Sequence, residues 1–377
     1  MIEGIEIFSG AGGLATGLGM SGVNHNAFVE WNPDACKTLR ENYDENLIFE
    51  GDIRDFDFSR HAGIDIIAGG PPCQPFSLGG KAKGNEDSRD MFPSAIRSIR
   101  ELLPKVFFFE NVKGLLRNSF SEYLQYILLQ LRYPTVRNSA DDWRTHVAAI
   151  NRSAKSIAAA ESYEVSVCLV NAADYGIPQR RERVVIIGVR KDLGREWTLP
   201  SPTHSCDALL WDKYVTEEYW QRHNIAPSND EFAIFPMQKK AICDKYGFFS
   251  PELNPWMTIR DALTDVPEAG ACSYFPEEHI IRDGAREYPG HTGSPIDEPS
   301  KTIKAGAHGV PGGENMIRFG DGKFRYLTIF EAKRIQTFPD NYRILGSWSE
   351  AMRQLGNAVP VKLANIISDS LIRSVLI

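Results

Sequence analysis

The chain has 377 residues, of which 42% are hydrophobic and 24% are charged, a composition that is typical of a folded protein and excludes a wholly disordered one. Its length allows one large α/β domain with a smaller companion, or two to three domains of ordinary size. No apolar run approaches the roughly 18 residues that a membrane helix needs, and the first residues lack the basic start of a secretory signal. We therefore expect a cytoplasmic protein without a membrane partner.

The formal net charge of −7 argues against a nucleic-acid partner, because lysine and arginine drive phosphate binding. The charge is unevenly distributed, however. Residues 206–290 hold 15 acidic and 8 basic side chains, so this one segment accounts for the whole negative surplus. Residues 301–345 hold 8 basic and 4 acidic side chains, so a locally basic surface is available.

A glycine-rich turn follows the first predicted strand. Residues 5–8 read IEIF and are followed directly by SGAGG at 9–13, with a helix expected from Leu14. Glycines at this place let the backbone approach a ligand closely, where a Cβ atom would clash.

Acidic residues end the next two predicted strands. Glu30 and Trp31 follow a strand at 26–29, and an acid about twenty residues after the glycine turn usually binds a ribose diol. Asp52 follows a strand at 47–49. One carboxylate for the ribose hydroxyls, another near the base and an aromatic wall would suit an adenosine.

Two dinucleotide-type patterns, GxGxxA at 10–15 and GxGxxG at 17–22, raise an NAD-dependent enzyme as an alternative. The second pattern falls inside or after the helix, where it cannot form the strand-to-helix turn that a pyrophosphate needs. The first is correctly placed, but an adenosine cofactor without phosphates would use it equally well.

Cys73 lies at the carboxyl end of a predicted buried strand, in the stretch IDIIAGGPPCQPFS at 64–77. Prolines on both sides restrict the backbone, so the thiol is held in a fixed direction. An inert core cysteine is the alternative, since free cysteines are commonly buried. None of the six cysteines belongs to a CxxC pair, and we expect no metal site.

Residues 77–89 are rich in glycine and lysine, and we interpret them as a mobile lid that carries charge to a phosphate backbone; a solvated surface loop is the alternative. A helix is expected at 92–103. The strand that follows, at 105–112, places Glu110 at its carboxyl end, either solvated or partly buried and facing the same crevice as Cys73.

A helix at 123–131 precedes a polar, partly alanine-rich stretch at 133–162, which we interpret as an insertion of unassigned role. After a strand at 164–170, Arg181 and Arg183 alternate into another strand, so both are expected on one face. Arginines that enter a buried strand require anionic or acceptor partners.

From Trp197 onward the sequence becomes rich in proline, aromatic residues and loops and loses its βα alternation, so we expect a second domain that extends to about Gly322. The chain then returns to an amphipathic helix at 328–337 and ends with a helix from Val361.

Five blocks resemble, in order and spacing, those of the cytosine-C5 DNA methyltransferases of the bacterial modification type. They are FSGAGG at 8–13, GPPCQPFS at 70–77, ENV at 110–112, QRRER at 179–183 and GNAVP at 356–360. The resemblance runs through nearly the whole chain, and five blocks in the right order are hard to obtain by chance.

The resemblance implies an α/β fold: a doubly wound, mostly parallel, Rossmann-like methyltransferase sheet with a smaller inserted target-recognition domain. The domains would be residues 1–200 for the S-adenosylmethionine-binding catalytic part with an insertion near 133–162, 201–322 for target recognition, and 323–377 for the return to the catalytic domain.

The activity implied by the resemblance is transfer of a methyl group from S-adenosylmethionine to carbon 5 of a cytosine flipped out of a specific double-stranded DNA sequence. Cys73 would attack carbon 6 and make the ring an enamine, because carbon 5 alone is a poor nucleophile. Glu110 would hydrogen-bond or protonate N3, Arg183 would hold O2 and orient Glu110, and Arg181 would lie near the sulfur and favour its ionised form.

Further roles follow from the same resemblance. Glu30 would bind the ribose, Asp52 would accept from the adenine amino group, and Pro72 would contact the cofactor near its methyl group. The other cofactor-binding residues would be Phe8, Gly10, Ala11, Gly13, Trp31, Ile53, Asn357 and Val359, and the residues that meet DNA would be Gln74, Ser77 and Arg89. S-adenosylhomocysteine would be the product.

The partner implied is double-stranded DNA, bound by a monomer, with a companion restriction endonuclease where the enzyme belongs to a restriction-modification system. A tRNA cytosine-C5 methyltransferase of the same family is the main alternative. The sizeable segment after Pro200 favours DNA, since sequence readout in the major groove needs its own surface. A non-catalytic DNA-binding member is the other alternative, against which intact Cys73 and Glu110 argue.

Overall fold

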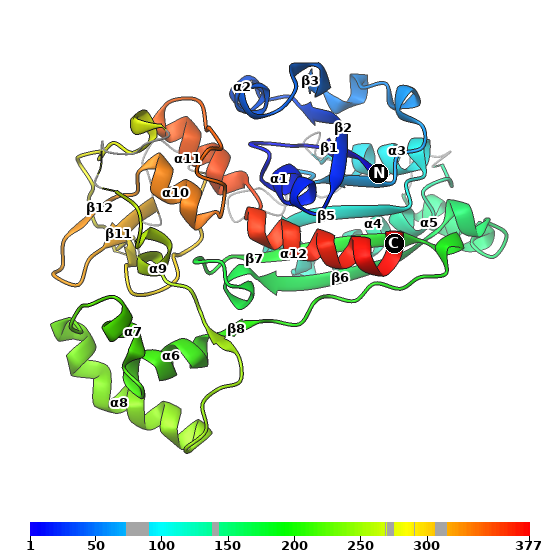
Figure 1. Ribbon diagram of the computed structural model, residues 1–377. Helices are drawn as coiled ribbons and strands as arrows, with labels where there is room; N and C mark the ends of the chain where they lie inside the picture. Colours follow the sequence, from blue (N-terminus) through cyan, green and yellow to red (C-terminus); the bar gives the residue numbers. More distant parts are fainter. Residues whose placement is uncertain (73–89, 138–142, 268, 270–274, 290, 306–314) are drawn as a thin grey trace. The chain divides into compact units, whose positions relative to one another are not determined.

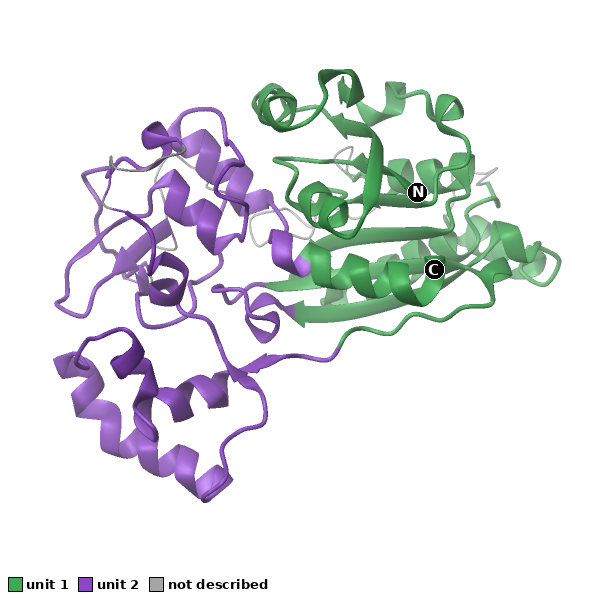
Figure 2. Ribbon diagram, viewed as in Figure 1, with its two compact units in different colours: residues 1–170, 182–200, 364–377 green, residues 171–181, 201–363 purple. Residues whose placement is uncertain are grey.

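The computed structural model describes residues 1–72, 90–137, 143–267, 269, 275–289, 291–305 and 315–377. These form two compact units (Figure 2). Unit 1 comprises Met1–Val170, Glu182–Pro200 and Ala364–Ile377, and unit 2 comprises Asn171–Arg181 and Ser201–Leu363. Within the described ranges, no helix combines the length and the apolar character that a membrane span requires.

A seven-stranded sheet forms the centre of unit 1, with the strand order β3-β2-β1-β4-β5-β7-β6 (Figure 1). β7 is antiparallel to β5, whereas β1, β2, β3, β4 and β5 pair in parallel. The mostly parallel α/β sheet expected from the sequence is therefore confirmed. The strands are β1 (Ile2–Ile7), β2 (Val23–Glu30), β3 (Ile48–Glu50), β4 (Ile66–Gly69), β5 (Val106–Val112), β6 (Tyr163–Asn171) and β7 (Glu182–Arg190).

Helices cover both faces of this sheet, because alternate strand residues point to opposite sides. Ala27 and Val29 of β2 enter the main core beneath α3 and α4, and Phe28 packs with Ala15 and Leu39 of α1 and α2 on the other face. The helices of unit 1 are α1 (Gly13–Met20), α2 (Pro33–Asn42), α3 (Phe92–Leu102), α4 (Ser121–Arg132) and α5 (Trp143–Ser153).

The last segment of the chain also belongs to unit 1. α12 (Val361–Leu371) lies beside α1 from residue 364 onward: the Ser368 and Ser21 hydroxyls are 2.6 Å apart, and Asn365 Nδ2 donates to Gly17 O at 3.4 Å. By their contacts, residues 364–377 belong to unit 1 and residues 171–181 to unit 2.

Unit 2 holds two small sheets and six helices among its described residues. The strands are β8 (His204–Ser205) with β9 (Asn254–Pro255), and β10 (Ser294–Pro295) with β11 (Met316–Arg318) and β12 (Phe324–Tyr326). The helices are α6 (Cys206–Tyr214), α7 (Glu218–Arg222), α8 (Asn229–Tyr246), α9 (Ile259–Leu263), α10 (Ile329–Ile335) and α11 (Trp348–Asn357).

The expectation of a loop-rich sequence is wrong for residues 206–246, which form α6, α7 and α8. α8 begins with Ser228, whose hydroxyl accepts a hydrogen bond of 3.3 Å from Glu231 N, and the helix continues through Pro236. A serine with an acid three residues later is a helix-start signal, and it outweighs the proline that usually interrupts a helix.

Candidate active site

The turn after β1 is built from left-handed backbone. Phe8, Gly10 and Gly12 have φ of 56°, 54° and 78°, and Gly12 is the N-cap of α1. An added Cβ at Gly10 would meet no atom within 4 Å, so the backbone conformation, and not crowding, favours glycine there. The turn thus leaves open space above Gly10 at the carboxyl end of β1.

Glu30 fixes this turn from the end of β2. Its Oε2 accepts from Gly10 N at 2.7 Å, and its Oε1 accepts from Trp31 N at 3.0 Å and Asn32 N at 2.8 Å. A carboxylate has about four acceptor positions, so three amides leave it capacity for a ligand hydroxyl. Trp31, next along the chain, has an indole that is 75% exposed.

Asp52 and Ile53 follow β3. Ile53 is buried, and Asp52 caps the short helix η2 (Ile53–Asp55). Hydrogen bonds from the Arg54 side chain hold the pKa of Asp52 below its usual range. Because Arg54 contacts both carboxylate oxygens of Asp52, an adenine amino group would share this acceptor with the arginine.

Glu110 and Arg183 are brought together at the ends of β5 and β7. Arg183 Nε lies 2.7 Å from Glu110 Oε1, and both side chains are nearly buried, at 12% and 10% exposure. Burial lowers the pKa of Arg183, and the charge of Glu110 acts in the opposite direction. The antiparallel register sets Glu110 opposite Val185, so the arginine two residues earlier reaches the carboxylate diagonally on the same face.

Asn111 connects the end of β5 to the turn after β4. Its Nδ2 donates to Pro71 O at 3.0 Å, and its Oδ1 accepts from Val112 N at 2.9 Å. A Cβ atom added at Gly70 would lie 3.5 Å from Glu110 Oε2, an ordinary contact distance, so the chain after β4 passes next to the carboxylate. The sequence analysis did not single out Asn111, although it stands in the quoted ENV block.

Arg181 has different partners from Arg183. It is 1% exposed, and its Nη2 donates to Gly356 O and Ala358 O, both at 2.9 Å, with Nη1 donating to Ile303 O at 3.4 Å. An added Cβ at Gly356 would lie 2.4 Å from Ala305 N, so only glycine allows these two chain segments to meet. Arg181 of the QRRER block is therefore joined to the GNAVP block inside unit 2.

The remaining predicted site residues divide into three groups. Ala11 and Gly13 are buried in the glycine turn and Pro72 is half-buried after β4, all in unit 1. Asn357 is exposed at the end of α11 and Val359 is buried, both in unit 2. The residues Cys73, Gln74, Ser77 and Arg89 lie outside the described part of the chain.

Glu6 is a buried acid that the sequence analysis passed over. It is 1% exposed in the middle of β1, and burial, together with the charge of Glu30, raises the pKa of its carboxyl well above the usual range. The signal was present in the sequence, because Glu6 interrupts the apolar run of a strand that a parallel sheet buries on both faces.

Known proteins resemble the chain over nearly its whole length. The family model described as C-5 cytosine-specific DNA methylase matches residues 2–133 and 144–373, which leaves only 134–143 of the expected insertion unmatched. A type II methyltransferase of Psychrobacter sp., M.PspPI, is 34% identical over 98% of this chain and 78% of its own length. M.NgoMIV of Neisseria gonorrhoeae is 29% identical over 98% of this chain and 97% of its own.

Solved structures share the fold at lower sequence identity. A putative DNA modification methyltransferase of an Escherichia coli prophage superposes with a TM-score of 0.60 at 21% identity, with both chains fully covered. The Dnmt2 methyltransferase of S. pombe gives a TM-score of 0.58 at 17% identity over 99% of each chain. The family match also removes the NAD-dependent alternative. The chain belongs to the C-5 cytosine-specific DNA methylase family and is a DNA (cytosine-5)-methyltransferase.

Proposed function

We propose that the chain methylates one cytosine within a specific double-stranded DNA sequence through a covalent bond between Cys73 and carbon 6 of the base. The ion pair between Glu110 and Arg183 is the observation that carries the proposal. Asn111 follows this pair directly and holds Pro71, two residues before Cys73. Asn111 thus fixes the chain two residues before Cys73 next to the acid, which supports the proposal that the thiol, the acid and the guanidinium act on one base.

Each residue has one task in this reaction. The Cys73 thiolate adds to carbon 6, and Glu110 hydrogen-bonds or protonates N3 so that the ring accepts the electrons as an enamine. Arg183 holds the base O2 and fixes the Glu110 carboxylate. Once carbon 5 carries the methyl group, its proton passes to solvent water, the double bond between carbons 5 and 6 re-forms, and the bond from carbon 6 to sulfur breaks to release the Cys73 thiolate. Arg181 supports the final block of the chain through the carbonyls of Gly356 and Ala358, and its predicted influence on the thiol stays part of the proposal.

The residues of the glycine turn fit an adenosine-type cofactor. Glu30 keeps acceptor capacity for the ribose hydroxyls, Trp31 offers an exposed ring for the adenine, and Gly10 leaves open space at the strand end. S-adenosylmethionine, the family's cofactor, supplies the methyl group when bound there. We also assign to this cofactor the residues Phe8, Gly10, Ala11, Gly13, Asp52, Ile53, Pro72, Asn357 and Val359.

Target recognition is assigned to residues 201–322, and Gln74, Ser77 and Arg89 are assigned to the DNA backbone and bases. The relatives named above are type II methyltransferases. We therefore place the chain in a type II restriction-modification system, as a monomer with a companion restriction endonuclease, in the cytoplasm.

Bisulfite sequencing of plasmid DNA from cells that express the chain tests the proposal and reads out the target. We expect one methylated cytosine per recognition site with the wild type and none with Cys73→Ser. Cys168→Ser, at a half-buried position on β6 outside the proposed sites, is the matched control and should leave the pattern intact. Methylation by the Cys73→Ser variant would refute the covalent route. Methylation of tRNA in place of DNA would refute the proposal that double-stranded DNA is the substrate.

A further inference from the structure

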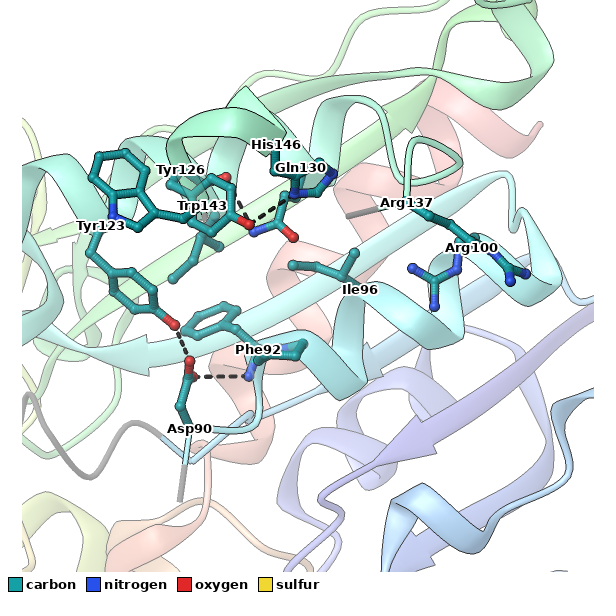
Figure 3. Close-up of a pocket in the computed structure, with 12 residues that line it drawn as sticks. Asp90, Phe92, Ile96, Arg100, Tyr123, Tyr126, Gln130, Arg137, Trp143 and His146 are labelled. Carbon is teal, nitrogen blue, oxygen red and sulfur yellow. Dashed lines mark hydrogen bonds between the residues drawn. The ribbon is translucent and has the colours of Figure 1, made fainter. Parts of the chain in front are cut away.

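A cavity lies between α3, α4 and α5 of unit 1, and none of its lining residues belongs to the glycine turn or to the Glu110–Arg183 pair. Its volume is about 430 Å³, within the range of roughly 300–1,000 Å³ that small-molecule sites occupy. Figure 3 shows Tyr123, Tyr126 and Trp143 gathered at one end and Arg100 and Arg137 at the other. The cavity is thus aromatic at one end and cationic at the other.

His146 holds the aromatic end together. Its Nε2 lies 2.9 Å from Val136 O and must donate to this carbonyl, so its Nδ1 accepts from Tyr126 OH at 2.8 Å when the ring is neutral. The Tyr126 ring in turn lies 5.8 Å from that of Trp143. α5, in the stretch read as an insertion, is therefore fixed on α4 with its tryptophan facing the cavity.

The opposite end holds Arg100 and Arg137, neither of which forms an ion pair with an acid among the described residues, although the charge of neighbouring Glu101 acts to raise the pKa of Arg100. Arg100 Nε is buried and has no hydrogen-bond partner in the part of the chain that the structure describes. Burial, and next the charge of Arg137, lowers the pKa of Arg100. A half-buried guanidinium beside a second positive charge is costly without an anion, and planar guanidinium groups suit phosphate oxygens.

We propose that this cavity is a second binding site, for a mononucleotide whose phosphate lies between Arg100 and Arg137 and whose base contacts Tyr126 and Trp143. Aromatic rings bind nucleobases by stacking without strong base preference, which fits the ring-lined end. Two guanidinium groups favour a doubly charged phosphate over a carboxylate. Asp90, whose carboxylate accepts from the Tyr123 hydroxyl and from Phe92 N, lies at the aromatic end, so its charge directs the phosphate toward the arginines.

Calorimetric titration of the full chain with guanosine 5′-monophosphate tests the site, with S-adenosylhomocysteine in excess to occupy the cofactor site. We expect one mole of nucleotide to bind per mole of chain. Guanosine and inorganic phosphate, titrated separately, should each bind at least about tenfold more weakly, because each keeps only one end of the site. Equal affinity for inorganic phosphate would refute the mononucleotide as the ligand.

Arg100→Ala should weaken nucleotide binding at least about tenfold, because it removes a charged hydrogen bond to the phosphate. Arg137→Ala changes an exposed residue, so it tests the same end of the cavity without endangering the fold. Arg132→Ala, exposed at the end of α4 and outside the cavity, is the matched control and should bind as the wild type does. No binding to the wild type, or unchanged affinity in both cavity variants, would overturn the proposal, and neither readout depends on methyl transfer.

Discussion

Asn111 Nδ2 donates a hydrogen bond of 3.0 Å to the carbonyl oxygen of Pro71, and both residues are buried. The bond joins the carboxyl ends of two neighbouring parallel strands, β4 and β5. Pro71 precedes Cys73 by two residues in the sequence, and Glu110 precedes Asn111 by one, so this hydrogen bond fixes the chain that leads to the proposed nucleophile beside the proposed acid.

Asn111→Ala should lower kcat for methyl transfer and reduce the free energy of unfolding by about 1–3 kcal/mol, because the variant leaves a buried carbonyl without a donor. Cofactor binding, measured by calorimetry, should be unchanged. Asn46→Ala is the control, since the Asn46 side chain donates to the carboxylate of exposed Asp44 and has no other hydrogen bond within the described residues. A destabilised variant with wild-type kcat would limit Asn111 to a structural role.

Loss of the ion pair between Arg183 and Glu110 should lower the free energy of unfolding far more than loss of an exposed ion pair nearby. Arg183→Ala leaves a nearly buried carboxylate without its partner, so we expect the free energy of unfolding to fall by about 3 kcal/mol and methyl transfer to fall with it. Urea denaturation and single-turnover methylation measure the two effects.

Lys113 and Glu182 form an ion pair between the same two regions of chain, but their side chains are 56% and 48% exposed. Lys113→Ala is therefore a matched control, with an expected loss below about 1 kcal/mol. Similar losses of unfolding free energy in the two variants would show that burial does not strengthen the Arg183–Glu110 pair. Wild-type turnover in Arg183→Ala would contradict the proposed contact of Arg183 with the cytosine.

Arg181 should be irreplaceable by lysine. Its guanidinium reaches three carbonyls on two segments, and an ammonium group cannot reproduce that planar arrangement. We expect Arg181→Lys to lower the free energy of unfolding by about 2–4 kcal/mol and to speed hydrogen exchange at Gly356 and Ala358. Arg180→Lys, whose pair with Glu298 is largely exposed, should change neither, and an unaltered exchange rate in Arg181→Lys would refute the assignment.

The sequence predicted those features of the site that depend on local chemistry. Glycines at a strand end, an acid at the end of the next strand and a buried strand before Cys73 each follow from neighbouring residues alone. The approach of Arg183 to Glu110 could not be predicted from neighbouring residues. It depends on the strand order, because β7 inserts between β5 and β6 and runs antiparallel to β5. Alternation placed Arg181 and Arg183 on one face, whereas the structure gives them separate partners because Arg181 precedes the strand.

Other features were missed although a signal existed. Ser228 and Glu231 mark the start of α8, but Pro236 and the aromatic residues around it favoured an irregular interpretation. The cavity between α3 and α5 could not have been predicted, since it depends on how His146 fixes α5 against α4. Contacts of this kind are determined by packing, which no periodicity in the sequence records.

Glu6 should make stability fall as pH rises. An unfolded glutamate titrates near pH 4.3, and burial raises the pKa of Glu6 in the folded chain, so between the two values the folded state binds more protons than the unfolded state. The contribution of the neutral carboxyl is complete below about pH 4.3 and is lost as the pH rises through the folded pKa. Because Glu6→Gln stays neutral, its free energy of unfolding relative to the wild type should increase by up to about 1.4 kcal/mol per pH unit in that interval.

Urea denaturation of both proteins at several pH values between about 5 and 8 measures this difference directly and cancels the titration of all other groups. Glu122→Gln, at an exposed position on α4, is the matched control and should differ from the wild type by the same amount at every pH. A difference between Glu6→Gln and the wild type that stays constant with pH would mean that Glu6 keeps an ordinary pKa in the fold. Its burial beside Glu30 would then require a compensating cation or hydrogen-bond donor.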